Sequence, residues 1–336
     1  MKWTAADVAR ERPRLQALAD YKYDEYQQFS PGLRFVESLA RWLRQVDPSE
    51  RSIAYDFVLQ KLLFVSAAEF SHLVATVYAD YVRPFLITRT ATELGIEPWR
   101  VAEITANKAF PIRERKTLYL GLSDGARLDV FRRANPNISN EQVYQTYEVR
   151  EERAADLKKN LVKDLGEEDP RFSTLVLLDD FAGTGYTYTK KIDRIAADLA
   201  DPEQPLTQLL DPHVDLVAVV YVATEFARGV LQKAAVTLQG VASSAIFPLH
   251  VIPDALALRR DSDPFSALVE KYYDWPELDD HFKKGGTDDA KYGFGGRGLP
   301  LVLTHNTPND SMFLLWTMKK KLRGLFPRVD RHKVIE

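Results

Sequence analysis

The chain has 336 residues, of which 45% are hydrophobic and none is cysteine. This length suggests about two domains, and the missing cysteines exclude disulfide frameworks, thiolate zinc sites and a cysteine nucleophile. The 45 basic and 48 acidic side chains leave a formal net charge of −3, so the charge of the whole chain gives no reason to expect binding to nucleic acid or membranes.

The first 110 residues are predicted to fold as helices. Ser66 and Glu69 have the spacing of a capping box at a helix start. An apolar stripe at helical spacing follows from 70 to 81. Pro84 is expected to end that helix, because proline in a helix interior removes a hydrogen bond.

No segment is predicted to target or to span a membrane. Charged and polar side chains interrupt the most apolar long stretch, 57–87, whereas a membrane helix needs about 20 mostly apolar residues. The N-terminus lacks the apolar core of a signal peptide. We therefore expect a cytoplasmic protein without a membrane segment, which the absence of cysteine also fits.

The pattern changes near Pro111, where short β-type runs begin to alternate with helical patterns. This alternation is typical of an α/β fold with a parallel sheet. Strands are predicted at 117–122, 142–148, 174–179, 214–222, 245–252 and 300–304. Helices are predicted at 126–133, 151–165, 186–199 and 225–238.

These patterns divide the chain into three expected regions. Residues 1–110 would form a helical N-terminal domain, where a homo-oligomer interface is most easily placed, and 111–260 would form the α/β core. Residues 261–336 would form a C-terminal extension with the last sheet strand and a basic tail. The tail has seven basic side chains and one acid between Lys319 and Lys333, and a solvated surface explains them better than contact with nucleic acid.

The most informative segment is 174–187, where an apolar strand ends in Asp179 and Asp180 and a glycine-containing turn opens a helix. Ligands of open α/β sheets bind at the carboxyl ends of the strands. Glycines let backbone N–H groups approach an anion, and a helix N-terminus favours its negative charge. The segment therefore predicts a phosphate cradle with two carboxylates beside it for sugar hydroxyls. The residues of the cradle are Ala182, Gly183, Thr184, Gly185, Tyr186 and Thr187.

This segment resembles the loop with which type I phosphoribosyltransferases bind 5-phosphoribosyl-1-diphosphate (PRPP). The resemblance implies a phosphoribosyltransferase-like α/β fold with a mostly parallel sheet. It also implies that Asp179 and Asp180 hold the ribose hydroxyls and that residues 182–187 hold the 5′-phosphate. Gly183 stands where threonine or serine is commoner, and Tyr186 is bulkier than usual, which leaves the choice of substrate open.

A second strand, turn and helix start lies upstream at 118–127 and includes Ser123, Asp124, Gly125 and Arg127. It resembles the loop that meets the diphosphate in the same family. The planar guanidinium of Arg127 suits bidentate contact with phosphate. An ordinary Asp-Gly turn with a surface arginine is the alternative interpretation of this segment alone.

The C-terminal segment 292–316 resembles the closing segment of phosphoribosyltransferase-like effectors from bacterial conflict and antiphage loci, some of them beside retron reverse transcriptases. His305 and Asn306 follow a predicted strand there, so they are candidates for a catalytic or base-contacting role. A turn closed by the Asn306 side chain is an equal alternative. Glu225, after the strand 214–222, is a further candidate for the cleft, although an acid at a helix start explains it more simply.

The resemblance implies a phosphoribosyltransferase-like glycosyltransferase that takes PRPP, or a related ribosyl or nucleotide ligand, and acts as an effector in antiphage defence. Mg²⁺ would enter with the diphosphate, and Asp179 and Asp180 are its candidate protein ligands. The flexible loop of the family would correspond to 150–165. Candidate partners are a second protein, or a reverse transcriptase with its nucleic acid.

Two other functions remain open from the sequence. The turn from Asp180 to Gly185 also resembles the glycine turn of amino-methyltransferases, which binds S-adenosylmethionine, but the proline and the catalytic tetrapeptide of those enzymes are missing. A protein of this fold could also sense a nucleotide or bind a partner without catalysis. The departures at Gly183 and Tyr186 permit that interpretation.

Overall fold

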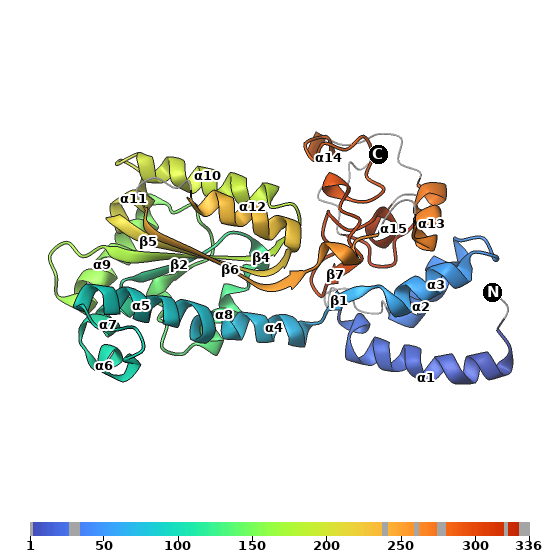
Figure 1. Cartoon of the computed structure of the whole chain (residues 1–336), viewed down its shortest axis with the longest axis horizontal. Coiled ribbons are helices and arrows are strands. Elements are labelled where there is room, and N and C mark those ends of the chain that lie inside the picture. Colours follow the sequence, from blue (N-terminus) through green and yellow to red (C-terminus); the bar gives the residue numbers. More distant parts are fainter. Residues whose placement is uncertain are drawn as a thin grey trace. The chain divides into compact units, whose positions relative to one another are not determined.

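The computed structural model describes residues 3–26, 34–236, 241–258, 262–273, 280–318 and 322–328. Contacts divide the chain into two compact units (Figure 1). One unit combines Met1–Phe70 with Pro253–Glu336, and the other is Ser71–Ile252. These units are defined by contacts within the chain, and the three ranges expected from the sequence stay a prediction.

The unit Ser71–Ile252 is built on a five-stranded sheet of order β3-β2-β4-β5-β6 in which all neighbours are parallel. The apolar runs of its central strands are buried on both faces, as parallel strands between two helical layers require. The predicted α/β fold is therefore confirmed. The strands are β2 (Thr117–Gly121), β3 (Val143–Tyr144), β4 (Phe172–Ala182), β5 (Leu210–Thr224) and β6 (Val241–Ile252).

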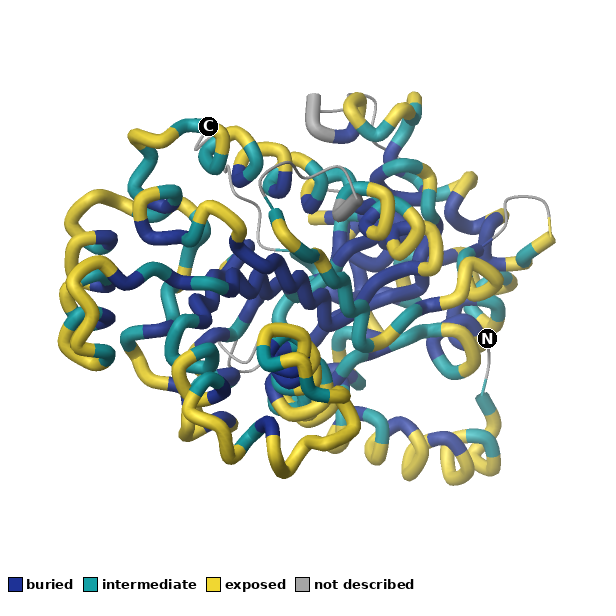
Figure 2. Tube along the Cα trace, turned by 60° about the vertical axis from the view of Figure 1, so that its left-hand side comes forward, coloured by how far each residue is buried: buried dark blue, intermediate teal, exposed yellow. Residues whose placement is uncertain are grey.

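Helices cover both faces of this sheet, and Figure 2 shows the strands as a buried layer between more exposed ones. One face carries α9 (Glu151–Leu165), α10 (Tyr186–Ala200), α11 (Pro205–Leu209) and α12 (Glu225–Val236), whose apolar side chains share one core with the strands. The opposite face in Figure 1 carries α5 (Arg83–Leu94), α7 (Ala109–Arg115) and α8 (Leu128–Ala134), with α6 (Val101–Ala106) beside α7.

The helix start predicted at Ser66 is confirmed, and the helix end predicted at Pro84 is wrong. Ser66 and Glu69 exchange the hydrogen bonds of a capping box at the start of α4 (Ala67–Thr76). A π-helical turn, Val77–Val82, leads directly into α5. Pro84 is the second residue of α5, and the helical backbone continues through it from the π-helical turn.

The other unit joins N-terminal helices to C-terminal segments around an aromatic core. Phe57 stacks on Phe265 with ring centres 4.0 Å apart, and Tyr23 meets Phe35 at 4.4 Å and Phe64 at 5.1 Å. Its first elements are α1 (Ala5–Tyr21), α2 (Phe35–Arg44), α3 (Arg51–Gln60) and β1 (Leu63–Val65). Its later elements are α13 (Pro264–Tyr272), α14 (Asp280–Lys283), β7 (Leu301–Leu303) and α15 (Phe313–Trp316).

The strand predicted at 300–304 exists, but it is not the last strand of the main sheet. It is β7, which pairs in parallel with β1 in a separate two-stranded sheet. The pairing was hidden because β1 is only three residues long and follows a helical pattern. Most of the predicted basic tail, including Lys319 and Lys333, lies outside the described residues. Within the described part of the chain, no helix is long and apolar enough to cross a membrane.

Candidate functional site

The two segments singled out by the sequence meet at the carboxyl edge of the five-stranded sheet. β2 and β4 are neighbours, with Gly121 opposite Leu178. From β2 the chain continues to β3 on one side, whereas from β4 it continues to β5 on the other. This is a topological switch point, where the loops diverge and leave a crevice that ligands of open α/β sheets use.

Asp180 is the point of contact between the two segments. Its Oδ1 accepts a hydrogen bond from Ser123 Oγ at 3.0 Å. Its carboxylate also lies against the Cα of Gly125, so that a Cβ at position 125 would collide with it. The predicted diphosphate loop thus packs on the predicted ribose-binding acid, and Gly125 is required by that close approach.

Asp179 faces the α10 side of β4, because neighbouring residues of a strand alternate between its faces. Its Oδ2 lies 3.2 Å from Lys191 Nζ, and its Oδ1 accepts the backbone N–H of Asp180 at 3.2 Å. Burial, together with the Asp180 carboxylate, raises the pKa of Asp179 to about 7, although Lys191 and Ser123 act to lower it. The two acids therefore occupy different environments, which the sequence did not predict.

The predicted phosphate cradle forms a tight turn into α10. Gly185 is the helix N-cap, with φ at 77°, and a Cβ there would lie 2.9 Å from the Val230 side chain. No side chain caps the first turn of α10 from that N-cap position, although Thr184 Oγ1 accepts from Tyr186 N–H at 3.3 Å. The backbone N–H groups at the start of α10 and the positive end of its helix dipole thus point toward the turn, as an anion site requires. Thr187 is exposed beside it, while Ala182 and Gly183 are buried.

Two residues of β5 that the sequence did not single out hold both loops in place. Tyr221 is fully buried and donates its hydroxyl to the Ala126 carbonyl at 2.5 Å. Thr224 donates to the Gly183 carbonyl at 2.5 Å and accepts from Ala227 N–H at 3.0 Å. Each residue bonds to a loop that is distant from it in sequence, so only the folded structure reveals the contact. Each is a positioning residue for a loop of the crevice.

Arg127 has a constrained backbone at the end of the predicted diphosphate loop. Its φ is 47°, the one positive value outside glycine among the described residues. Side chains rarely adopt this conformation, which costs about 1–3 kcal/mol at a non-glycine residue. Its guanidinium is half-buried and 3.9 Å from Asp129, a loose contact that leaves it available to an anion. Asp124 is exposed at the start of the same turn.

The remaining sequence candidates are His305, Asn306 and Glu225. His305 and Asn306 belong to the other unit, on the turn after β7, where His305 packs edge-on against Phe70 and Asn306 closes the turn through backbone bonds to Leu303. Their catalytic role stays a prediction. Glu225 is exposed in the first turn of α12 and pairs with Arg228 at 3.7 Å, as an ordinary acid at a helix start does.

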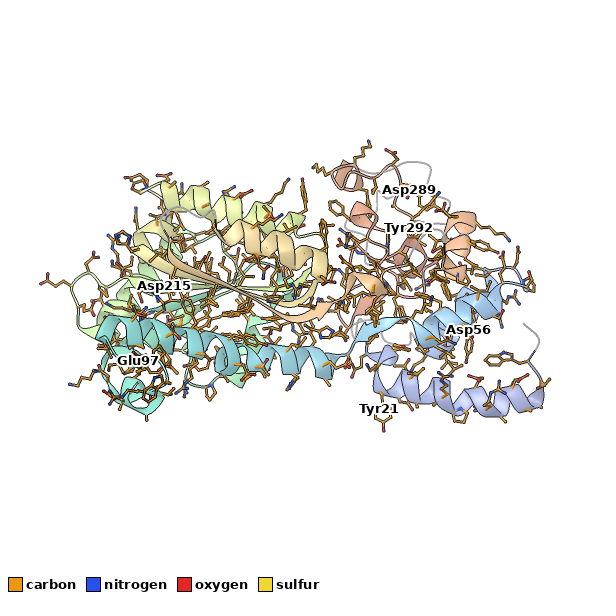
Figure 3. The ribbon with its side chains drawn as sticks, in the orientation of Figure 1. Tyr21, Asp56, Glu97, Asp215, Asp289 and Tyr292 are labelled. Carbon is orange, nitrogen blue, oxygen red and sulfur yellow. The ribbon has the colours of Figure 1, made fainter. Side chains whose placement is uncertain are left out.

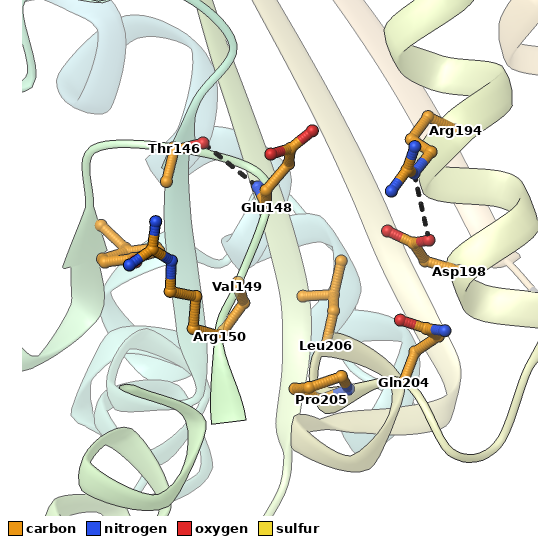
Figure 4. A pocket seen from close by; sticks show the side chains of 10 residues that line it. Thr146, Glu148, Val149, Arg150, Arg194, Asp198, Gln204, Pro205 and Leu206 are labelled. Atoms are coloured by element: carbon orange, nitrogen blue, oxygen red, sulfur yellow. Dashed lines mark hydrogen bonds and ion pairs between the residues drawn. The ribbon is translucent and has the colours of Figure 1, made fainter. Parts of the chain in front are cut away.

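A separate cavity of about 340 Å³ opens on the face that carries α10 and α11 (Figure 4). It is lined by the segment after β3, by Arg194 and Asp198 of α10, and by the start of α11. None of the predicted site residues lines it. Arg150, which does, begins α9, a regular helix with a buried face. The expectation of a flexible loop at 150–165 is therefore wrong, and the predicted helix there is confirmed.

Asp179 is poorly suited to bind Mg²⁺. This ion prefers oxygen ligands in octahedral geometry and keeps several waters. Asp179 does not fit, because both of its oxygens have partners within the protein and its side chain is only 5% exposed. In the described part of the chain no three potential metal ligands gather.

Replacing Tyr221 by phenylalanine removes the hydroxyl that fixes the Ala126 carbonyl. We expect the free energy of unfolding of this variant to be about 1–2 kcal/mol lower than that of wild type, because a buried carbonyl loses its hydrogen-bond partner. Chemical denaturation of both proteins measures this difference. Tyr147→Phe, at a half-buried tyrosine of the same unit, is the control and should change stability by less than about 0.5 kcal/mol. Equal stability of the Tyr221 variant and wild type would contradict the assignment.

The raised pKa of Asp179 predicts a pH-dependent stability. The groups that face it are Lys191 and Tyr188 of α10, Asp180 and Ser123. Because the folded carboxyl binds its proton more tightly than the unfolded one, it stabilises the fold at low pH. That contribution is lost as pH rises from about 4, the ordinary aspartate value, through about 7.

Asp179→Asn removes this titration. Relative to wild type, we therefore expect the variant to gain stability between pH 5 and pH 8, by at most about 1.4 kcal/mol per pH unit. Urea denaturation of both proteins at several pH values tests this. A stability difference that does not change across that range would show that Asp179 titrates normally in the folded protein.

Comparison with known families gave one match. The PRTase-CE family model matches residues 39–328, which include both loops of the crevice, the acids between them and the segment after β7. Comparisons with curated proteins and with solved structures gave no match. Because the match spans most of the chain, this protein belongs to the PRTase-CE family and is phosphoribosyltransferase-like.

Proposed function

We propose that this chain binds PRPP, or a closely related ribosyl diphosphate, at the switch point between β2 and β4 and transfers its ribosyl group. The observation that supports this most is the contact of Asp180 with both Ser123 and Gly125. It brings together, at one edge of the sheet, the acid proposed to bind the sugar, the loop proposed to bind the diphosphate and the turn proposed to bind the phosphate. A ligand with a phosphate, a cis-diol and a diphosphate matches that order of groups.

Each part of the ligand would meet a different part of the crevice. The 5′-phosphate would accept hydrogen bonds from the turn 182–187 at the N-terminus of α10. The ribose hydroxyls would donate to Asp180, whose charge strengthens such bonds. The diphosphate would lie against the loop 123–127, where Arg127 provides a guanidinium. Mg²⁺, if present, would arrive bound to the diphosphate.

The proposed reaction is glycosyl transfer at the anomeric carbon. The bond between C1 and the diphosphate oxygen breaks, and the diphosphate leaves with the electron pair. A nitrogen or oxygen nucleophile of the acceptor forms the new bond to C1 and releases its proton. Positive charge develops on the sugar ring meanwhile, so catalysis would rest on positioning and on the nearby carboxylate rather than on a protein nucleophile.

The same site supports a proposed role as an effector in antiphage defence, including retron-associated systems. The support for this role is the resemblance of the C-terminal segment to such effectors. The partner would be a second protein or a reverse transcriptase with its nucleic acid. Loss of phage protection in cells that carry an Asp180→Asn copy of the gene would connect this site to defence.

The ligand is tested most simply by thermal unfolding. PRPP at about 100 times its dissociation constant should stabilise the protein by about 2.7 kcal/mol, which corresponds to roughly 5–10 °C in midpoint. S-adenosylmethionine should have no effect; stabilisation by that compound instead would favour a methyltransferase. If PRPP binds, diphosphate released in the presence of candidate acceptors identifies a transferase, whereas binding without release identifies a nucleotide sensor.

A further inference from the structure

Lys191 lies on the inward face of α10, where a charged side chain is unusual. Tyr188, Ile192 and Ile195 on this face are buried. Lys191 Nζ is 3.2 Å from Asp179 Oδ2, and only 16% and 5% of the two side chains are exposed. A buried ion pair adds little net stability, because desolvation offsets the attraction. Its presence beside the paired acids therefore points to a role other than stability.

This ion pair prevents other cations from binding to the Asp179 carboxylate. Its second oxygen accepts the Asp180 N–H, so neither oxygen of the carboxylate is left without a partner. A divalent ion at Oδ2 would have to displace the Lys191 ammonium, whose Nζ lies 3.2 Å from that oxygen. The ammonium at Oδ2 would also repel a divalent ion.

A cation beside the two acids would help this site to bind an anionic ligand. Two adjacent carboxylates repel an anionic ligand, and this repulsion must be compensated before the ligand can lie beside them. A divalent metal shared by both acids would provide compensation in one arrangement. An ammonium carried by α10 provides it in another, and it is present before the ligand arrives.

We propose that Lys191 is a fixed cation that occupies Asp179 in place of a divalent metal, so that any divalent ion enters this site only with the ligand, on the Asp180 side. The statement about the ligand rests on the proposed function. The statement about Asp179 does not, because it concerns the protein alone. The experiment therefore starts without ligand.

Mn²⁺ is the probe, and the loss of its free electron paramagnetic resonance signal at pH 8 measures binding to the full chain. We expect Lys191→Met to bind Mn²⁺ at least tenfold more tightly than wild type. The gain should disappear when Asp179→Asn is added. Lys190→Met is the matched control, because Lys190 is exposed and its Nζ lies over the Tyr186 ring at 4.8 Å; it should behave as wild type.

Two results would overturn the inference. One is a Lys191→Met protein, folded by circular dichroism, that binds Mn²⁺ no better than wild type. The other is a wild type whose own Mn²⁺ binding is lost in Asp179→Asn. If the methionine variant does not fold, Lys191→Gln replaces it, and Lys191→Arg, which keeps the charge, should exclude Mn²⁺ as wild type does.

A second arm measures PRPP affinity by calorimetry with and without Mg²⁺. We expect removal of Mg²⁺ to weaken binding at least tenfold more in Lys191→Met than in wild type. An equal Mg²⁺ dependence in the two proteins would contradict the role of Lys191 toward the ligand. If wild type binds no PRPP under either condition, the proposed function fails, while the Mn²⁺ result for Asp179 is unaffected.

Discussion

Asp180→Asn is expected to weaken PRPP binding by about 10- to 100-fold. The variant keeps the shape of the side chain but loses the charge that would accept the ribose hydroxyls, and hydrogen bonds to charged groups contribute about 1.5–3 kcal/mol each. The asparagine oxygen can still accept from Ser123, which bonds to Asp180 at 3.0 Å. The fold should therefore survive, and calorimetric titration with PRPP measures the loss.

The control for this variant lies on α10. Asp193→Asn removes the same charge from an exposed position on that helix and should leave PRPP affinity within about twofold, since exposed charges act weakly through water. The double variant Asp179→Asn with Asp180→Asn should show no PRPP-dependent rise in thermal midpoint. If the Asp180→Asn protein bound PRPP as tightly as wild type, Asp180 would not be part of the binding site.

Asp215→Ala is expected to cost about 3–5 kcal/mol of unfolding free energy, the usual effect of removing one partner from a buried charge network. Asp215, at the start of the apolar part of β5 (Figure 3), is only 2% exposed. Its Oδ2 accepts from Arg89 of α5 at 2.8 Å and from Arg113 of α7 at 3.1 Å. Without it, the arginines of two helices that cover the sheet lose their shared partner.

The comparison is with an exposed pair of the same unit. Glu103 of α6 lies 2.5 Å from Arg100, and 45% and 52% of the two side chains are exposed. Glu103→Ala should therefore cost less than about 1 kcal/mol. Urea denaturation of both variants separates the two cases. Similar small losses would show that the Asp215 network does not hold α5 and α7 to the sheet.

The sequence predicted those parts of the site that local chemistry determines. The apolar strand, the acids and the turn into α10 follow one another within fifteen residues, so propensity and motif were sufficient. The helix 151–165 was predicted with the bounds that the structure shows, because its apolar periodicity and its terminal Gly166 lie within one segment. The family's flexible loop, placed there by resemblance alone, was wrong.

The sequence did not reveal what depends on contacts between distant elements. Tyr221 and Thr224 support the loops from β5, and the pairing of β1 with β7 joins segments more than 200 residues apart. Lys191 could have been found: it lies three residues after Tyr188, on the stripe that faces the sheet, where a lysine breaks the apolar pattern. A charged residue on a predicted inward face next to paired acids is the signal that was available.

The most direct test of the central claim is a crystal structure of the protein soaked with PRPP and Mg²⁺. Density for the 5′-phosphate at the turn 182–187, for the ribose at Asp180 and for the diphosphate at the loop 123–127 is the predicted result. PRPP bound elsewhere, for example in the cavity beside Arg194 and Asp198, would contradict it. So would an ordered crevice that stays free of ligand at saturating PRPP.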